Sequence, residues 1–395
     1  MVELNFMNST LFIFDTHPIQ YRAPVFRALA KRLPGLKVFF FDSAFDGKKW
    51  WFQEVDKIPR QDFGLPLEEG YSHSILGTRK MGFFQKWGTF KKILTAERPE
   101  AILIYGYYQV EHWILRMLSN QLNIPLIFVG ETFDWRGSFF RKMIKKVLIS
   151  RFFQKVNEFI SIGNKTFQYY QSWGISPVLI TKANYCTDPS GFLLGEKEAQ
   201  FAREQIRKQL NIPQDDFVML FVGRLFERKR PHDLLRIHQL LDRFKKVHTL
   251  IVGNGELSEE LKKQSQNLSR VYFPGFQNQK EIKNFYYAAD ILVVPSEFET
   301  WGLVVNEAFA CGLPALVTST CGSAEDLVIP NENGAIFPVG DCNSASQTIE
   351  RLLVEPNLAR VWGTNARKRV LENYTPSHFA ASIMTAFQKA ISKSI

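Results

Sequence analysis

The stretch SEFETWGLVVNEAFACGLP (Ser296–Pro314) decides how the rest of this chain is interpreted. It follows an apolar run, Asp290–Pro295, which predicts a buried strand of a parallel sheet. Two carboxylates, Glu299 and Glu307, lie eight positions apart on either side of a glycine turn. The apolar, alanine-rich residues after that turn predict a helix. The expected order is therefore a strand, a loop that carries Glu299, and a helix that carries Glu307 in its early turns.

This order of strand, loop and helix indicates a particular kind of ligand. The first turn of a helix has N–H groups without intrahelical acceptors and lies at the positive end of the helix dipole, which suits a phosphate. An ionised glutamate only accepts hydrogen bonds, so a carboxylate nearby suits the hydroxyls of a sugar or ribose. The segment therefore predicts a site for a molecule that contains both phosphate and polyol.

Short apolar runs alternate with amphipathic stretches along almost the whole chain. This alternation predicts an α/β protein whose parallel sheets have helices on both faces, with ligands beyond the carboxyl ends of the strands. The expected strands are Leu11–Phe14, Lys37–Phe41, Ala101–Tyr105, Leu126–Val129, Phe159–Ile162, Phe217–Val222, His248–Val252, Arg270–Phe273, Asp290–Val294 and Ala315–Thr318. The expected helices include Ala23–Lys31, Trp113–Asn123, His232–Phe244 and Glu281–Ala288. The turn residues within Thr187–Gly195 predict a boundary between two domains of similar size.

A second group of polar residues follows the expected strand Phe217–Val222. Gly223 allows a ligand to approach the backbone closely, and Arg224 and Lys229 place two cations just beyond the strand end. Such cations neutralise the charge that grows on a leaving diphosphate. The alternative is a solvated basic loop, because runs of charge often lie on a protein surface. The sequence has no Asp-x-Asp element and its histidines are dispersed, so we expect no metal ion and no other cofactor.

These features together resemble the Glu-x7-Glu signature of retaining glycosyltransferases of family 4, which have the GT-B fold. The likeness extends to Val222–Leu225 with Lys229, to Gly253–Glu256, to Phe273–Phe276 and to Asn333–Gly334. It implies two Rossmann-like doubly wound domains that face each other across a cleft. Residues 1–190 would bind the acceptor, and residues 191–374 would bind the nucleotide sugar. A C-terminal helix over about 375–395 would complete the first domain.

The resemblance also implies roles for individual residues. Arg224 and Lys229 would act on the leaving diphosphate, and Glu299 would contact hydroxyls of the donor sugar. Glu307 would accept hydrogen bonds from the ribose hydroxyls. The backbone contacts to the nucleotide sugar would come from Gly223, Gly302, Leu303 and Val304.

The chain departs from the family pattern at two places. Many members have Lys-Gly where this chain has Lys229-Arg230, so we expect the helix near Pro231 to begin differently. Many members also have a histidine after the strand that corresponds to Ala101–Tyr105, whereas here the nearest histidine is His112, a turn later.

Three residues are predicted to contact the acceptor. His17 and Gln20 follow the first expected strand, in a His-Pro-Ile-Gln-Tyr string that some family members share. Glu131 follows the strand Leu126–Val129. Polar side chains at strand ends are placed for binding. For His17 the alternative is a packed or capping residue.

The net charge of +10 is concentrated in the first half of the chain. Residues 1–190 have 25 Lys and Arg against 16 Asp and Glu, while the remainder has 24 against 23. The stretch 139–155 holds six cations and no acid, with apolar residues near helical spacing. This pattern is typical of a helix on an anionic membrane, and the alternative is a surface helix that packs on its own domain. Because the four cysteines lack metal spacing and neither a signal peptide nor a transmembrane run is evident, we expect a cytoplasmic protein. If the basic stretch is a membrane helix, the protein would be peripheral on the inner face of the membrane.

The sequence therefore predicts a metal-independent retaining glycosyltransferase. It would move a hexose from a nucleotide-diphosphate sugar, carrying UDP or GDP, to a glycan or lipid-linked acceptor in polysaccharide or glycoconjugate synthesis. One alternative is a nucleotide-sugar epimerase or hydrolase of the same fold, although its histidine-rich set is not found. The alternative outside enzymes is a basic nucleic-acid-binding protein, suggested by a pI of about 9.3. No nucleic-acid module is recognisable, so we expect no nucleic-acid partner.

Overall fold

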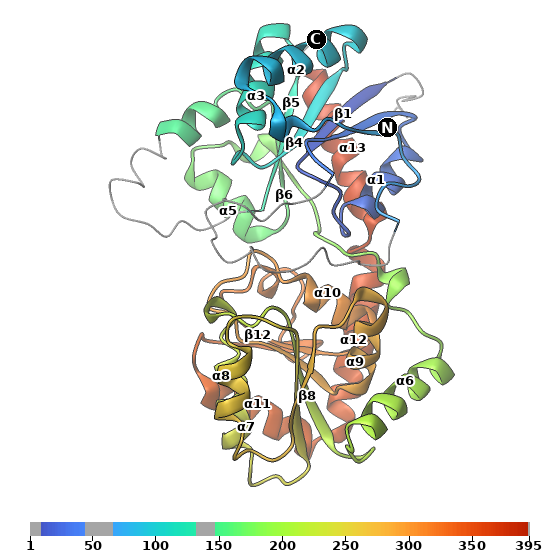
Figure 1. The fold of residues 1–395 in the computed structure, drawn as a ribbon, viewed down its shortest axis with the longest axis vertical. Coiled ribbons are helices and arrows are strands. Elements are labelled where there is room, and N and C mark those ends of the chain that lie inside the picture. The colour runs from blue at the N-terminus through green and yellow to red at the C-terminus, as the bar shows by residue number, and fades with distance from the viewer. Residues whose placement is uncertain (1–8, 44–65, 132–146, 394–395) are drawn as a thin grey trace. The chain divides into compact units, whose positions relative to one another are not determined.

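The structure, a computed structural model, describes residues 9–43, 66–131 and 147–393. These residues form two compact units (Figure 1). The N-terminal unit consists of the described residues before Cys186 together with those from Pro376 onward, and the C-terminal unit is Cys186–Thr375. The sequence analysis predicted divisions after residues 190 and 374.

The N-terminal unit is built on a seven-stranded sheet in the order β3-β2-β1-β4-β5-β6-β7. Every neighbouring pair is parallel. Its central strands are almost entirely buried and rich in Leu, Ile, Val and Phe, as parallel strands covered on both faces require. The strands are β1 (Thr10–Asp15), β2 (Gly35–Phe40), β3 (His73–Ile75), β4 (Ala101–Tyr105), β5 (Leu126–Gly130), β6 (Glu158–Ser161) and β7 (Ile180–Lys182).

Helices from both ends of the chain cover this sheet. They are α1 (Ala23–Ala30), α2 (Phe83–Glu97), α3 (Val110–Leu122), α5 (Asn164–Ser172) and the last helix, α13 (Pro376–Ser392). In Figure 1, α13 (red) lies beside α1, and it also packs on β6. Lys389 of α13 and Lys393, directly after this helix, form ion pairs with the fully buried Glu158 of β6. A buried carboxylate needs such partners, so these pairs hold the end of the chain in the N-terminal unit.

The C-terminal unit is built on a six-stranded parallel sheet in the order β10-β9-β8-β11-β12-β13. Its strands are β8 (Phe217–Val222), β9 (Val247–Val252), β10 (Val271–Gly275), β11 (Ile291–Val294), β12 (Ala315–Thr318) and β13 (Gly334–Phe337). Its helices are α6 (Glu196–Gln209), α7 (His232–Leu240), α8 (Ser258–Gln264), α9 (Gln279–Ala288), α10 (Leu303–Ala310), α11 (Cys342–Val354) and α12 (Pro356–Asn373). The prediction of two parallel α/β domains is confirmed for the described residues.

Three strands were not predicted, and the end of α7 was predicted too late in the sequence. The sequence analysis missed β3, β7 and β13, each of which lies next to or at a sheet edge and has only three or four residues. Strands this short do not show a reliable periodicity. The helix α7 ends at Leu240 rather than at Phe244. The N–H of Leu241 donates to the backbone oxygens of Ile237 and His238, and the chain then enters a turn.

The strand order reverses at one point in each sheet, between β1 and β4 and between β8 and β11. Loops that leave neighbouring strands in opposite directions open a crevice at such a point, and ligands of open α/β sheets bind there. The residues after these four strands are therefore where a site is expected. In the part of the chain that the structure describes, no helix is long and apolar enough to cross a membrane.

Candidate active site

In the C-terminal unit, the loops after β8 and β11 meet at the point where the strand order reverses. Lys229, in a short 3-10 turn after β8, forms an ion pair with Glu299, which follows β11. Their side chains are only 16% and 11% exposed. The structure thus joins two residues that are 70 positions apart in the sequence and that were predicted to act on neighbouring parts of one ligand.

A third residue fixes the two loops to each other. Arg228 donates a hydrogen bond of 3.0 Å to the backbone oxygen of Phe298, and its own backbone oxygen accepts one of 2.9 Å from the N–H of Glu297. The arginine side chain also lies over the rings of Phe226 and Phe298. The Lys229–Glu299 pair therefore lies in a braced segment, which reduces the cost of holding two charged side chains together.

The departure from the family pattern at Arg230 has a clear structural outcome. Arg230 has a φ of 49°, in the left-handed region that a glycine adopts at little cost. Its guanidinium forms an ion pair with Asp233, with hydrogen bonds of 2.7 and 3.0 Å to the two carboxylate oxygens. The backbone turn is thus one that suits glycine, and α7 begins directly after Pro231.

Arg224 lies at the end of β8, two residues beyond Val222. Its guanidinium carbon is 5.7 Å from the centre of the Phe226 ring. The turn itself depends on close backbone approach. A Cβ on Gly253 would lie 1.8 Å from the backbone oxygen of Gly223, so the loops after β8 and β9 pack closer than any other residue at position 253 allows. Arg224 therefore emerges from a tightly packed turn between neighbouring strand ends.

Gly302 controls how α10 begins. Its φ is 92°, and a Cβ there would lie 2.9 Å from the sulfur of Cys321 and 3.3 Å from the Cγ of Glu299. The glycine thus permits both the left-handed turn and the close packing of Glu299 beside the start of the helix. Leu303 and Val304 form the first turn, whose N–H groups have no acceptor within the helix. These groups suit a phosphate, as the sequence predicted.

Glu307 lies one turn into α10 and accepts a hydrogen bond of 2.6 Å from the hydroxyl of Tyr286 on α9. Burial raises the pKa of Glu307 to about 7, and the Tyr286 hydrogen bond opposes this rise. The sequence analysis missed Tyr286. In the sequence Tyr286 is only an aromatic residue at helical spacing in an amphipathic helix, and such a residue is predicted to lie in the core.

The N-terminal unit has a polar cluster where the strand order of its own sheet reverses. Arg22 forms an ion pair of 2.5 Å with Asp15, at the end of β1, and another of 2.5 Å with Glu131, just after β5. Its guanidinium carbon lies 4.0 Å from the centre of the Tyr105 ring, at the end of β4. Tyr185 donates a hydrogen bond of 2.7 Å to Glu131. We call these five residues the Arg22 cluster.

The three residues predicted to contact the acceptor have different surroundings. Glu131 belongs to the Arg22 cluster and is part-exposed. The Nδ1 of His17 lies 2.9 Å from the Thr16 hydroxyl, and burial lowers the pKa of its ring. The side-chain oxygen of Gln20 is buried and finds no donor among the described residues. His112 is buried at the start of α3, where its Nδ1 accepts the N–H of Gln109, so it caps this helix.

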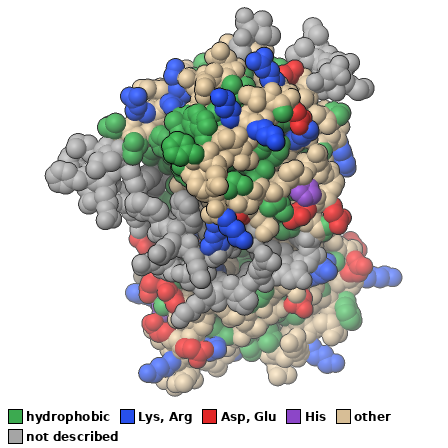
Figure 2. All heavy atoms as spheres, turned by 45° about the horizontal axis from the view of Figure 1, so that its top comes forward, with side chains coloured by type: hydrophobic (Ala, Val, Ile, Leu, Met, Phe, Trp, Pro, Cys, Tyr) green, Lys and Arg blue, Asp and Glu red, His purple; other side chains and the backbone are tan. Residues whose placement is uncertain are grey.

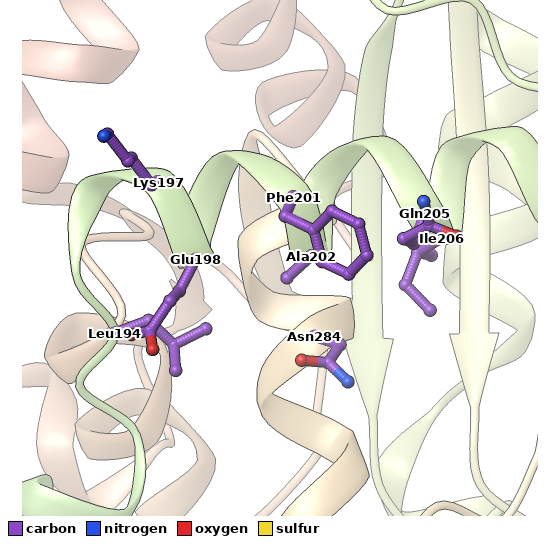
Figure 3. Close-up of a pocket in the computed structure, with 8 residues that line it drawn as sticks. All are labelled: Leu194, Lys197, Glu198, Phe201, Ala202, Gln205, Ile206 and Asn284. Atoms are coloured by element: carbon purple, nitrogen blue, oxygen red, sulfur yellow. The ribbon is translucent and has the colours of Figure 1, made fainter.

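A cavity of about 420 Å³ lies elsewhere in the C-terminal unit, along α6 (Figure 3). Its lining includes Phe201 from α6 and Asn284 from α9. None of the residues predicted for the donor lines it. We therefore do not assign this cavity to the donor. Among the described residues, no group of three or more His, Cys, Asp or Glu is arranged to hold a metal ion.

Comparison with known proteins finds a family match within the C-terminal unit. Residues 202–369 match the family "Glycosyl transferases group 1". The chain is 32% identical over 203 residues to D-inositol 3-phosphate glycosyltransferase of Corynebacterium jeikeium, which covers 49% of this chain and 46% of that protein. It is 30% identical over 176 residues to the capsular polysaccharide biosynthesis glycosyltransferase CapM of Staphylococcus aureus, covering 44% and 45%. These matches support a group 1 glycosyltransferase domain. The match spans about half the length of these relatives.

The fold of the whole chain has close neighbours among solved structures. HepE of Anabaena, solved in complex with UDP and glucose, superposes with a TM-score of 0.73 at 18% identity, covering 96% of this chain and 100% of that one. The fold is GT-B. At this identity the likeness concerns the fold alone, so the roles predicted for Arg224, Lys229, Glu299 and Glu307 stay predictions.

Proposed function

We propose that this protein is a retaining glycosyltransferase that transfers a hexose from a nucleotide-diphosphate sugar. The observation that carries the proposal is the meeting of Lys229 and Glu299 at the point of strand reversal, beside the start of α10. A cation for the diphosphate, a carboxylate for sugar hydroxyls and the N–H groups of a helix then lie in one segment. That HepE was crystallised with UDP and glucose accords with a donor of this class.

The proposed reaction needs no metal ion and no cofactor. The bond between the sugar C1 and the diphosphate oxygen breaks, and the acceptor hydroxyl forms a new bond to C1 on the same face. The proton of that hydroxyl passes to the leaving diphosphate oxygen. Lys229 and Arg224 stabilise the charge that develops on the diphosphate, where preorganised donors have their largest effect. To reach the diphosphate, Lys229 exchanges its Glu299 partner for the ligand, and Glu299 becomes available to the sugar hydroxyls.

The acceptor is proposed to be a glycan or a lipid-linked glycan in polysaccharide or glycoconjugate synthesis. The support is the group 1 family match and the capsular polysaccharide glycosyltransferase among the relatives. The Arg22 cluster, with Glu131 part-exposed, offers carboxylate acceptors to sugar hydroxyls. His17 and Gln20 lie on the same loop after β1 and remain proposed contacts.

Thermal stabilisation and product stereochemistry together test this function. We expect UDP or GDP to raise the melting temperature and a single-stranded oligonucleotide to leave it unchanged, since ligands stabilise the state that they bind. Incubation with nucleotide sugars and a glycan acceptor should then give a product whose anomeric configuration, read by NMR, is that of the donor. Stabilisation by the oligonucleotide alone would support the nucleic-acid alternative. Release of free sugar or an epimer without transfer would support the epimerase or hydrolase.

We also propose that the N-terminal unit contacts an anionic membrane surface. Residues 139–146 of the basic stretch lie outside the described residues; in the remainder, Val147 and Leu148 are exposed while Phe152 is buried in the unit's core. A second feature adds support. At the start of α2, Phe84 is 87% exposed and Phe83 45%.

The exposed Arg79 and Lys80 precede these two phenylalanines. Figure 2 likewise shows hydrophobic side chains gathered beside Lys and Arg on this unit. Apolar side chains with a basic surround suit the interface of an anionic bilayer, where each cation near the surface contributes about 1 kcal/mol.

Vesicle cosedimentation tests the membrane contact. Glutamate at Lys142, Lys145 and Lys146, or Phe84→Asp, should release the protein from vesicles that contain anionic lipid. Phe201→Asp is the matched control, because Phe201 is an exposed aromatic of the other unit. Transfer to a soluble acceptor analogue should survive in all of these variants. A wild-type protein that does not bind the vesicles at physiological salt would remove the membrane proposal and leave the transferase proposal standing.

A further inference from the structure

Two adjacent tyrosines of α9 have different partners in the C-terminal unit. The hydroxyl of Tyr286 donates to one oxygen of Glu307 at 2.6 Å. The hydroxyl of Tyr287 donates to the backbone oxygen of Phe192 and accepts from the N–H of Leu194 and from Arg367. Both hydroxyls are therefore satisfied, but only that of Tyr286 contacts a residue predicted to bind the donor.

We propose that Tyr286 is a positioning residue for the nucleotide: its hydroxyl holds one oxygen of the Glu307 carboxylate, so that the other oxygen is aimed at the hydroxyls of the ligand. This inference rests on the proposed function of Glu307. A glutamate has three rotatable side-chain bonds, and fixing it in advance removes the side-chain entropy that the glutamate would otherwise lose on ligand binding. Tyr286 itself is held firmly, because its ring is 1% exposed and packs edge-on against Phe192.

The same hydrogen bond favours the charge state that the ligand needs. Ligand hydroxyls donate to an ionised carboxylate, and a hydroxyl donor stabilises that ionised form. Burial raises the pKa of Glu307 to about 7, and the Tyr286 hydrogen bond works in the opposite direction. Tyr286 therefore keeps Glu307 ionised at a lower pH than burial alone allows.

Other groups around Glu307 come from the elements packed on α10, namely α9, α12, β12 and the 3-10 turn Pro189–Gly191. Cys311 lies at the end of α10 itself, and the cations Lys283 of α9 and Arg367 of α12 act on its thiol. Neither β12 nor the 3-10 turn contributes a titratable side chain. Tyr286 is the group whose hydrogen bond acts on the Glu307 carboxylate directly.

The test compares Tyr286→Phe with Tyr287→Phe in the full chain, using the affinity for UDP and GDP between pH 5.5 and 8.5. In the wild type the affinity should rise as pH increases through about 7. In Tyr286→Phe the midpoint of this rise should move to higher pH, and affinity at pH 7 should fall about tenfold, as expected for the loss of a hydrogen bond to a charged group. Tyr287→Phe should keep the wild-type midpoint. Titration of the ligand's own phosphates is common to all variants, so the difference between variants reports the protein's contribution to the pH dependence.

A double substitution separates positioning from packing. In a Glu307→Gln background the part of the pH dependence that is due to Glu307 should disappear, and adding Tyr286→Phe should have little further effect, because the two residues act as one unit. If Tyr286→Phe folds normally and keeps the wild-type affinity and midpoint while Glu307→Ala loses binding, the positioning role is wrong and the proposed function stands. If Glu307→Ala also binds normally, the proposed role of Glu307 fails first.

Discussion

The two units have the same kind of sheet but different polar groups where their strand order reverses. In the C-terminal unit, Lys229 pairs with one carboxylate, Glu299, and further cations lie on the same loop. In the N-terminal unit, one cation, Arg22, lies between two carboxylates, Asp15 and Glu131. In the first arrangement the cations outnumber the paired carboxylate, so an anion is attracted. In the second the carboxylates outnumber the cation, so an anion is not attracted. One topology thus carries the charge that suits the proposed diphosphate in one unit and, in the other, a charge that suits hydroxyls better than phosphates.

The largest expected effect concerns the N-terminal cluster. Arg22→Met should lower the free energy of unfolding by about 3–5 kcal/mol, because it leaves the fully buried Asp15 without its cation. Denaturant unfolding followed by circular dichroism measures this. Arg27→Met is the control, because Arg27 lies on α1 and its hydrogen bond to the backbone oxygen of Pro66 is exposed. Stability equal to the control would mean that the Arg22 cluster does not hold the unit together.

The next effect concerns turnover in the C-terminal unit. Lys229→Ala and Arg224→Ala should each reduce kcat about 10²–10³-fold, because each removes a donor to the charge that develops on the diphosphate. Steady-state kinetics with a nucleotide sugar that the wild-type protein transfers measure this. Lys245→Ala is the control, because Lys245 pairs with Asp242 on the exposed surface. Wild-type turnover in both variants would show that the diphosphate role is wrong.

Glu299→Gln sharpens the same comparison. It removes the partner that Lys229 has in the absence of ligand, so transfer should fall while affinity for the nucleoside diphosphate is kept or improves.

The sequence predicted the C-terminal site better than the N-terminal cluster for a physical reason. Glu299, Gly302 and Glu307 are close along the chain, so one strand, one turn and one helix fix their relation. The Arg22 cluster draws on β1, β4, β5 and Tyr185, and its pairing depends on side-chain reach across several strand ends. Periodicity does not report such contacts. The sequence singled out Glu131 as an acceptor contact but not Asp15, and only the fold brings both to one guanidinium.

Glu307 should make the stability of the C-terminal unit depend on pH. Its pKa in the folded protein, about 7, lies above the ordinary value of 4.5, so the folded state retains a proton that the unfolded state has lost between these values. Stability should therefore fall as pH rises from about 4.5 to about 7, by up to about 3 kcal/mol. Glu307→Gln should remove this fall. Unfolding curves at pH 5 and pH 8 for both proteins measure the difference, and an equal pH dependence in the two would contradict the assignment.

The smallest expected effect concerns the turn at Arg230, where the chain has arginine in a backbone conformation that suits glycine. Arg230→Gly and Arg230→Ala both remove the ion pair with Asp233, but only glycine adopts a φ of 49° without strain. The glycine variant should therefore be more stable than the alanine variant by about 1 kcal/mol. Paired chemical denaturation measures this. Both variants should keep their nucleotide affinity, because the ion pair joins Arg230 to Asp233 of α7 and does not involve Lys229 or Glu299. If alanine proved as stable as glycine, the turn would have relaxed out of the left-handed region. A loss of nucleotide affinity in both variants would instead place Arg230 among the cations that meet the diphosphate.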